Sequence, residues 1–134
     1  KTMLGDGARI TDAVRGLEES SLRIVLVVDA EKRLIGTVTD GDIRRGLIRH
    51  LRLDDPVTTV MNNSPVIASS RQSLDTILAL MRQWDVLQVP IIDEDGRVSR
   101  LEFLQELTDR RILENSFKTI RTYFKKMSEK TDFF

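Results

Sequence analysis

The chain of 134 residues contains two segments of similar pattern that lie 64 positions apart. Each segment runs from a helical spacing of apolar residues to an apolar strand, an acidic turn, a second strand and the start of another helix. Identical residues at this offset are few, and between residues 10–43 and 74–107 they are Val25/Val89, Asp29/Asp93 and Arg33/Arg97. The pattern rather than the identity therefore carries the repeat, and it predicts two units of related fold.

The first unit is predicted to contain two helices and two strands. The spacing of Ile10, Ala13, Val14 and Leu17 is that of a helix face. The expected elements are a helix over about 11–19, strands over 24–28 and 34–38, and a helix from about 41 to 49 that Thr39 or Asp40 caps.

The second unit repeats this order, and a linker precedes it. Ser73 is expected to cap a helix that runs to about Gln83, and strands follow over 88–92 and 97–101. In the linker, Asp55-Pro56 has the pattern of an N-cap followed by a first helical residue, which predicts a short helix over 57–61. Residues 66–68 are expected to form a short strand.

Composition excludes several classes of function. The 21 basic and 21 acidic side chains balance, which argues against general binding of nucleic acid or of anionic membranes. The absence of cysteine excludes disulfides, thiol nucleophiles and thiolate metal sites, and the single histidine, His50, excludes zinc sites with several histidines. No apolar run is long enough to span a bilayer, and no signal peptide is visible. No arrangement of a nucleophile with an oriented base is found, so we expect no catalytic residues and no enzyme activity in this chain.

The best candidate for chemistry is the junction of strand and helix at residues 36–45. Thr39 offers a hydroxyl beside the free N–H groups of a helix start, where a phosphate can bind. Asp42 offers two acceptor oxygens for the hydroxyls of a ribose, and Gly36 and Gly41 permit a ligand to approach the backbone. The alternative interpretation is a simple turn, in which Thr39 is an N-cap and the acidic residues interact with the helix dipole.

The same residues resemble a known family. Leu34 to Arg45, with the order Gly-x-x-Thr-x-x-Asp, and the strands Val27-Val28-Asp29 and Val89 to Asp93 look like a pair of CBS (cystathionine β-synthase) domains, a Bateman module. The resemblance covers about residues 10–107. It implies an α/β (α+β) fold in which tandem repeats form a pseudo-twofold disc that commonly dimerises.

This resemblance also implies a function. Such modules bind AMP, ADP, ATP or sometimes S-adenosylmethionine, possibly with magnesium, and regulate a partner catalytic domain. The run Thr39 to Arg45 is most similar to the pairs attached to sugar nucleotidyltransferases, and arabinose-5-phosphate isomerases carry a similar variant. We therefore expect a cytoplasmic, homodimeric regulatory module with no nucleic-acid or membrane partner and no bound metal of its own. The alternative is a structural or dimerisation module that binds no ligand.

The resemblance implies a site that both units complete. Its ligand-binding residues would be Gly36, Thr37, Thr39, Asp40, Asp42 and Arg45 from the first unit and Val66, Ile67, Ala68, Leu87, Gln88, Val89 and Pro90 from the second. Asp40 places negative charge where a phosphate would bind, and Arg44, Arg45 or magnesium would have to offset it.

The second unit departs from this pattern. At the offset of the repeat, Arg100, Phe103 and Glu106 replace Gly36, Thr39 and Asp42. The predicted second pocket is therefore degenerate, and one competent site is expected.

The end of the chain has a different composition. An apolar stripe, spaced by four and three residues in alternation, predicts an amphipathic helix, and its members are Leu113, Phe117, Ile120, Phe124 and Met127. Such a stripe packs on its own domain, on a second subunit or on another domain, and membrane-surface binding is the weakest alternative. The expected organisation is repeat 1 over 1–53, a linker over 54–65, repeat 2 over 66–109, and a C-terminal helix and tail over 110–134.

Overall fold

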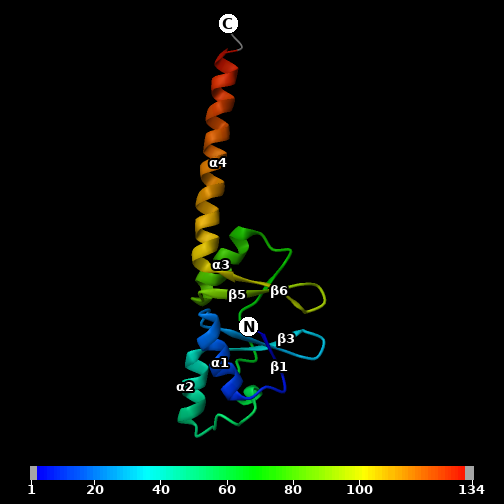
Figure 1. Cartoon of the computed structure of the whole chain (residues 1–134). Coiled ribbons are helices and arrows are strands. Elements are labelled where there is room, and N and C mark those ends of the chain that lie inside the picture. The colour runs from blue at the N-terminus through cyan, green and yellow to red at the C-terminus, as the bar shows by residue number, and fades with distance from the viewer. Residues whose placement is uncertain (1–2, 132–134) are drawn as a thin grey trace.

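Each repeat unit folds into a three-stranded sheet with helices packed on it, as a computed structural model describes for residues 3–131 (Figure 1). The first unit contains β1 (Met3–Gly5), α1 (Ile10–Ser20), β2 (Val25–Val28), β3 (Leu34–Val38) and α2 (Asp40–Ile48). The second unit contains β4 (Ala68–Ser69), α3 (Leu74–Trp84), β5 (Gln88–Ile92), β6 (Val98–Phe103) and α4 (Leu104–Thr131). The mixed α+β fold with tandem repeats and a C-terminal helix is confirmed.

The two sheets have the same topology and the same register. Their strand orders are β1-β2-β3 and β4-β5-β6, in which the first pair is parallel and the second pair is antiparallel. Leu4 pairs with Val27 in the first sheet, and Ala68 pairs with Ile91 at the corresponding position of the second. The sequence analysis did not predict β1, although the offset of 64 relates it to β4.

Each unit has its own hydrophobic core. The first core is formed by Ile10, Ala13, Val27, Val38, Ile43, Val57 and Val60, and the second by Ala68, Ile77, Leu78, Met81, Val89, Ile91 and Leu107. The linker thus belongs to the first core, because the side chain of Val57 is fully buried there. Two cores of this size, each of which buries mainly aliphatic side chains, stabilise the units separately.

The tips of the two β-hairpins hold each other in a reciprocal arrangement, which we call the hairpin clasp (residues 29–33 and 93–97). Arg33 Nε donates to the Asp95 carbonyl at 3.2 Å, and Arg97 Nε donates to the Glu31 carbonyl at 3.0 Å. The Leu34 N–H also donates to the Gly96 carbonyl at 3.1 Å. In Figure 1 the two loops lie next to each other at one side of the molecule.

Both tips have the same internal structure. Asp29 Oδ1 accepts from two backbone N–H groups of its turn, and Asp93 Oδ1 does the same in the other hairpin. Lys32 precedes Arg33, and Gly96 precedes Arg97 at the equivalent position. Both residues adopt a positive φ, of 66° and 83°. The identities Asp29/Asp93 and Arg33/Arg97 in the sequence therefore mark the contact between the units.

The linker differs from the sequence-based expectation in its details. The short helix over 57–61 is a single 3₁₀ turn, Val57–Thr59, and its N-cap is Pro56 rather than Asp55. The Asp55 carboxylate accepts instead from the Arg52 N–H at 2.6 Å, which closes the preceding turn. The strand expected over 66–68 is Ala68–Ser69.

The C-terminal helix is longer than expected. It begins at Leu104, directly after β6, and its first turns pack on α3 and β6. The boundary proposed between residues 109 and 110 falls inside this continuous helix. Four members of the apolar stripe, namely Leu113, Phe117, Ile120 and Phe124, are 49–63% exposed among the described residues. Among residues 3–131, no helix has the length and hydropathy needed to cross a bilayer.

Gly36 is required by the close approach of the linker to β3. A Cβ at Gly36 would lie 2.6 Å from Met61 Sδ and 2.9 Å from the Asn62 carbonyl oxygen, where Thr37 and Asn62 exchange two backbone hydrogen bonds. We predict that Gly36→Ala lowers the free energy of unfolding by about 1–3 kcal/mol, because the linker backbone must shift. Urea denaturation measures this change.

Gly7→Ala is the matched control, because a Cβ at Gly7 meets no described atom within 4 Å and its φ is not positive. Equal midpoints for the two alanine variants would show that the linker accommodates the methyl group.

Candidate functional site

A cavity of about 290 Å³ lies between the two units. Its lining consists of Arg23, Ile24, Thr37, Thr39, Asn62, Pro65, Val66, Val86, Leu87, Gln88 and Pro90. The first unit and the linker contribute the polar side, and the second unit contributes most of the apolar side. One hydrogen bond joins the two sides, from Gln88 Nε2 to the Leu22 carbonyl at 2.8 Å. The cavity therefore exists only when both units are in place.

Thr39 marks the point where β3 ends and α2 begins. It is the N-cap of α2, and its hydroxyl oxygen accepts from the Asp42 N–H at 3.4 Å. Its own N–H and hydroxyl donate to Asp42 Oδ2 at 2.8 and 3.0 Å, which completes a capping box. The turn predicted from the sequence as the alternative interpretation is thus present in the structure.

Asp42 is held by this capping box rather than directed into the cavity. Its second carboxylate oxygen, Oδ1, accepts from Arg45 Nη2 at 2.7 Å, and the side chain is 13% exposed. All the described contacts of this carboxylate are thus within the first turns of α2. Binding of a ribose by Asp42 stays a prediction, and it would require the carboxylate to exchange one of these contacts.

The structure brings together about half of the residues predicted for the site. Those that line the cavity are Thr37, Thr39, Val66, Leu87, Gln88 and Pro90. Ala68 and Val89 lie in the second core, and Ile67 lines another cavity beside Leu34 and Ile35.

The predicted glycine and acidic residues have other neighbours in this structure. Gly36 faces the linker, and Gly41 lies against the side chain of Arg45. Asp40 lines a separate cavity between α1 and α2 with Glu18 and Arg44. Its negative charge is therefore outside the lining of the cavity between the units.

Sequence reasoning missed five lining residues, namely Arg23, Ile24, Asn62, Pro65 and Val86. Arg23 is the most informative of them, because it is the only charged residue of this lining. It has a positive φ of 62° just before β2. The repeat could have indicated it, since the offset of 64 relates Arg23 and Ile24 to the predicted residues Leu87 and Gln88.

The lining suits a ligand with one apolar face and one anionic end. Ile24, Val66, Leu87 and the two prolines offer flat aliphatic surface, while Arg23, Thr37 and Asn62 offer polar groups. No carboxylate belongs to this lining, and no pair of nucleophile and base occurs in it. No group of three or more His, Asp or Glu side chains that could hold a metal ion occurs within residues 3–131.

The corresponding residues of the second unit have a different arrangement. Arg100 Nε donates to Glu102 Oε1 at 2.5 Å, and the Glu102 side chain is only 5% exposed. Arg110 Nη2 lies 3.6 Å from the other carboxylate oxygen. The arginine that replaces Gly36 is therefore part of an ion-pair cluster that ties β6 to α4.

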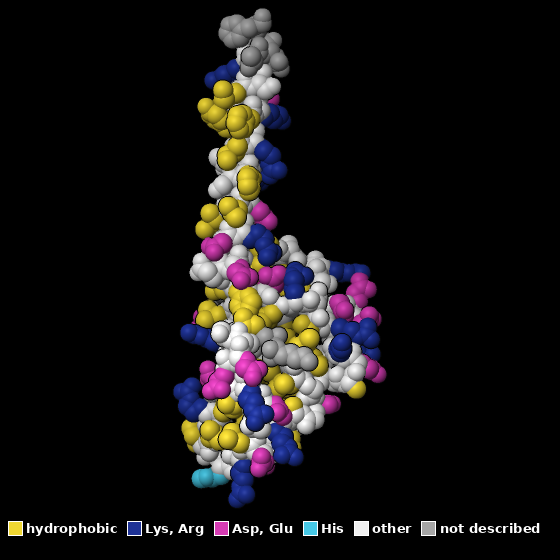
Figure 2. Space-filling model, viewed as in Figure 1, with side chains coloured by type: hydrophobic (Ala, Val, Ile, Leu, Met, Phe, Trp, Pro, Cys, Tyr) yellow, Lys and Arg dark blue, Asp and Glu magenta, His cyan; other side chains and the backbone are white. Residues whose placement is uncertain are grey.

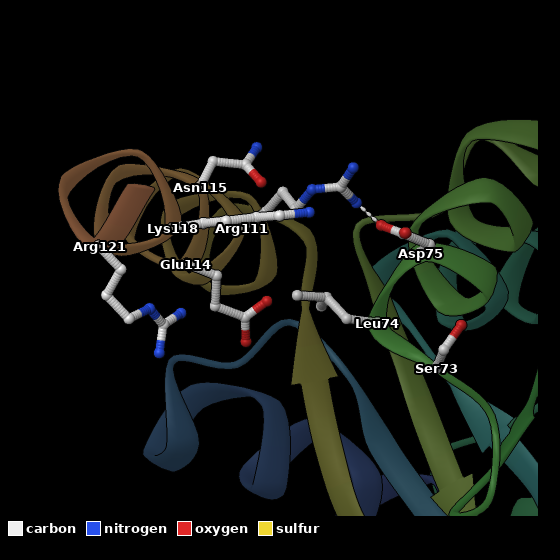
Figure 3. A pocket seen from close by; sticks show the side chains of 8 residues that line it. All are labelled: Ser73, Leu74, Asp75, Arg111, Glu114, Asn115, Lys118 and Arg121. Atoms are coloured by element: carbon white, nitrogen blue, oxygen red, sulfur yellow. Dashed lines mark ion pairs between the residues drawn. The ribbon is translucent and has the colours of Figure 1, made fainter. Parts of the chain in front are cut away.

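A larger cavity, of about 510 Å³, lies between the start of α3 and one face of α4 (Figure 3). Charged side chains of both signs line it, including Asp75, Arg111, Glu114 and Lys118. Arg111 forms an ion pair with Asp75 across it. Because Arg111 and Asp75 pair with each other and little apolar surface is offered, this cavity is a weaker candidate for a small-molecule site.

Comparison with known families gives a match over most of the chain. The family model described as the CBS domain matches residues 3–49 and again residues 57–114. The two matches coincide with the two repeat units.

Two curated proteins with similar sequences are enzymes that are longer than this chain. Arabinose 5-phosphate isomerase GutQ of Escherichia coli K12 is 31% identical over 100 residues, which are 74% of this chain and 31% of that protein. Inosine-5'-monophosphate dehydrogenase of Aquifex aeolicus is 26% identical over 111 residues, which are 82% of this chain and 22% of that protein. The chain thus spans less than a third of the length of these relatives.

Solved structures share the fold at low sequence identity. The CBS domain protein PAE2072 from Pyrobaculum aerophilum, complexed with AMP, is 20% identical with a TM-score of 0.73, over 88% of this chain and 91% of that one. The CBS domain pair of protein MJ0100, in complex with 5'-methylthioadenosine and S-adenosyl-L-methionine, is 20% identical with a TM-score of 0.69, over 82% and 89%.

The N-cap of α2 can be tested through stability. Thr39→Ala is expected to lower the free energy of unfolding by about 0.5–2 kcal/mol, because the capping hydroxyl is lost. Thr39→Ser keeps the hydroxyl and is expected to stay close to the parent protein. Thermal and urea denaturation compare the three proteins, and an alanine variant as stable as the serine variant would contradict the capping role.

Proposed function

Since the chain belongs to the CBS domain family, we propose that it is a regulatory module that binds an adenine nucleotide between its two units. The observation that carries this proposal is the composition of one cavity. An aliphatic slot, the start of a helix and a single arginine meet there without a carboxylate in the lining. We propose that ligand binding alters a partner catalytic domain and that this chain itself catalyses no reaction.

The adenine base is proposed to lie in the aliphatic slot. Val66, Leu87 and Pro90 come from the second unit and face Ile24 of the first unit across the cavity. Their contact with a flat base removes apolar surface from water, which favours binding without aromatic stacking. Gln88 is fixed by its bond to the Leu22 carbonyl, and its amide can form hydrogen bonds with the base edge.

The phosphate is proposed to bind between Arg23 and the start of α2. The N–H groups at a helix start carry partial positive charge and favour an anion. Arg23 adds a full positive charge at the same cavity. Asp40 lines a different cavity, so its negative charge does not oppose the phosphate at the proposed site. A magnesium ion is therefore not required there to offset that charge.

The size of the cavity favours a mononucleotide. Its volume of about 290 Å³ lies near the lower end of the range of small-molecule sites, which is roughly 300–1,000 Å³. The complexes of PAE2072 with AMP and of MJ0100 with two adenosine derivatives support an adenosine ligand.

The partner is proposed to be a catalytic domain that acts on a phosphorylated sugar. The similarity to arabinose 5-phosphate isomerase GutQ supports an isomerase. The nucleotidyltransferase expected from the run Thr39 to Arg45 is the second candidate, because neither relative named above is of that class. We also propose a cytoplasmic location, as the resemblance to regulatory CBS pairs implies.

The alternative function is a structural module without a ligand. Two observations favour it, namely the complete engagement of Asp42 in the capping box and the replacement of Gly36 by Arg100 in the second unit. This alternative predicts that no adenine nucleotide binds at millimolar concentration.

Titration calorimetry with AMP and with adenosine tests the site through Arg23→Gln. We expect the substitution to weaken AMP binding about fivefold, the effect of one partly exposed ion pair of ~1 kcal/mol. We expect adenosine binding to change little, because adenosine has no phosphate.

Arg15→Gln removes the same charge from the exposed surface of α1 and serves as the control. Equal losses of AMP and adenosine affinity in Arg23→Gln would contradict a phosphate contact. No heat with any adenine nucleotide would leave the structural module as the better account.

A further inference from the structure

The outer part of α4 exposes an apolar face that nothing in the described chain covers. Leu113, Phe117, Ile120 and Phe124, which we call the seam, are 57%, 59%, 49% and 63% exposed. The helix projects away from both units (Figure 1), and Figure 2 shows apolar side chains gathered along one side of it, with lysine and arginine on the other. An isolated helix gains little stability from propensity alone, so this face requires a partner.

The spacing of the seam specifies the kind of partner. Its residues are separated by four, three and four positions, which is the 3.5-residue repeat of a coiled coil. In this frame Phe117 and Phe124 occupy a positions, and Leu113 and Ile120 occupy d positions. Asp109 and Lys130 fall at g positions, and Glu114 and Arg121 fall at e positions, beside the seam.

We propose that the seam pairs with the seam of a second copy of this chain in an antiparallel coiled coil. Leu113 would lie opposite Phe124 of the second copy, and Phe117 opposite its Ile120. This register forms four apolar layers, because the twofold axis repeats each pair. The two nucleotide-binding bodies would then lie at opposite ends of the helix pair.

Charge decides between the antiparallel and the parallel arrangement. In the antiparallel register, facing e positions bring Glu114 to Arg121 of the second copy, and facing g positions bring Asp109 to Lys130. Both pairs have opposite sign, and each occurs twice. A parallel pair would place Asp109 beside Glu114 of the second copy and would form no pair of opposite charge.

The rest of the molecule leaves the seam accessible. Arg111 and Lys118 lie on the side of α4 that faces α3, where Arg111 pairs with Asp75 (Figure 3). Both residues occupy b positions, away from the a and d positions of the seam. Glu114 and Arg121 also line the cavity beside α3, but their side chains point together in a different direction from Arg111 (Figure 3). The helix can therefore pack on α3 and on a second copy at the same time.

Sedimentation of the full chain tests this dimer without any nucleotide, so its outcome is independent of the proposed function. We expect monomer and dimer to coexist at protein concentrations of about 5–200 µM, and we expect the dimer fraction to rise with concentration by mass action. Ile120→Asp is expected to raise the dissociation constant at least ~10-fold, since a charge at a d position would be buried. Thr122→Asp, on an outer position of the same helix, is the matched control, and circular dichroism verifies that both variants are folded.

Reversal of one charge tests the orientation. In the antiparallel dimer, Glu114→Arg faces Arg121 of the second copy, so we expect the dissociation constant to rise about threefold. In a parallel dimer the same variant would face Asp109 and would tighten association. The double variant Glu114→Arg/Arg121→Glu is expected to recover the affinity of the parent chain.

Three results would overturn the proposal. They are a parent chain that stays monomeric over the whole range, an Ile120→Asp variant that associates like the parent, and a Glu114→Arg variant that associates more tightly. A parent chain that stays monomeric would indicate that another domain covers the seam. Tighter association of Glu114→Arg would indicate a parallel pair of helices.

Discussion

The hairpin clasp joins the two units by three hydrogen bonds, and the bond from Gln88 Nε2 to the Leu22 carbonyl joins them at the cavity. Each unit has its own sheet and its own core, so neither core fixes the position of the other unit. Arg33 and Arg97 each reach the backbone of the opposite turn, and the bonds have nearly equal length because the repeat makes them equivalent. The carboxylates of Asp29 and Asp93 hold the turns in the shape that this contact requires. Two of the three identities between the units, Asp29/Asp93 and Arg33/Arg97, are thus explained by the clasp.

The cavity follows from this arrangement, because its walls come from both units. Of the residues that resemble a nucleotide motif in sequence, Thr37 and Thr39 line the cavity, whereas Gly36 and Asp42 have other roles. Asp42 stabilises the first turn of α2, and Gly36 makes room for the linker. The chemistry available to a ligand comes instead from Arg23, from the start of α2 at Thr39 and from the aliphatic wall around Leu87.

Local patterns predicted the elements well, because capping and periodicity depend on neighbours in sequence. Thr39 and Ser73 cap the helices they were expected to cap, and the hairpin strands begin and end within two residues of the expected positions. The lining of the cavity could be predicted only in part, because it depends on how two units meet. Near β4, three consecutive residues have different surroundings: Val66 lines the cavity, Ile67 lines another cavity, and Ala68 enters the core. Arg23 lies in a loop with a positive φ that no periodic pattern marks.

We propose one nucleotide site that is built from both CBS units. An NMR titration of the labelled chain with AMP tests it directly, because each backbone amide reports on its own surroundings. We predict chemical-shift changes of the backbone amides of Arg23 and Thr39 in the first unit. The amides of Leu87 and Gln88 in the second unit are expected to shift at the same AMP concentration. Shifts confined to one unit, shifts centred on the cavity between α3 and α4, or none at millimolar AMP would contradict it.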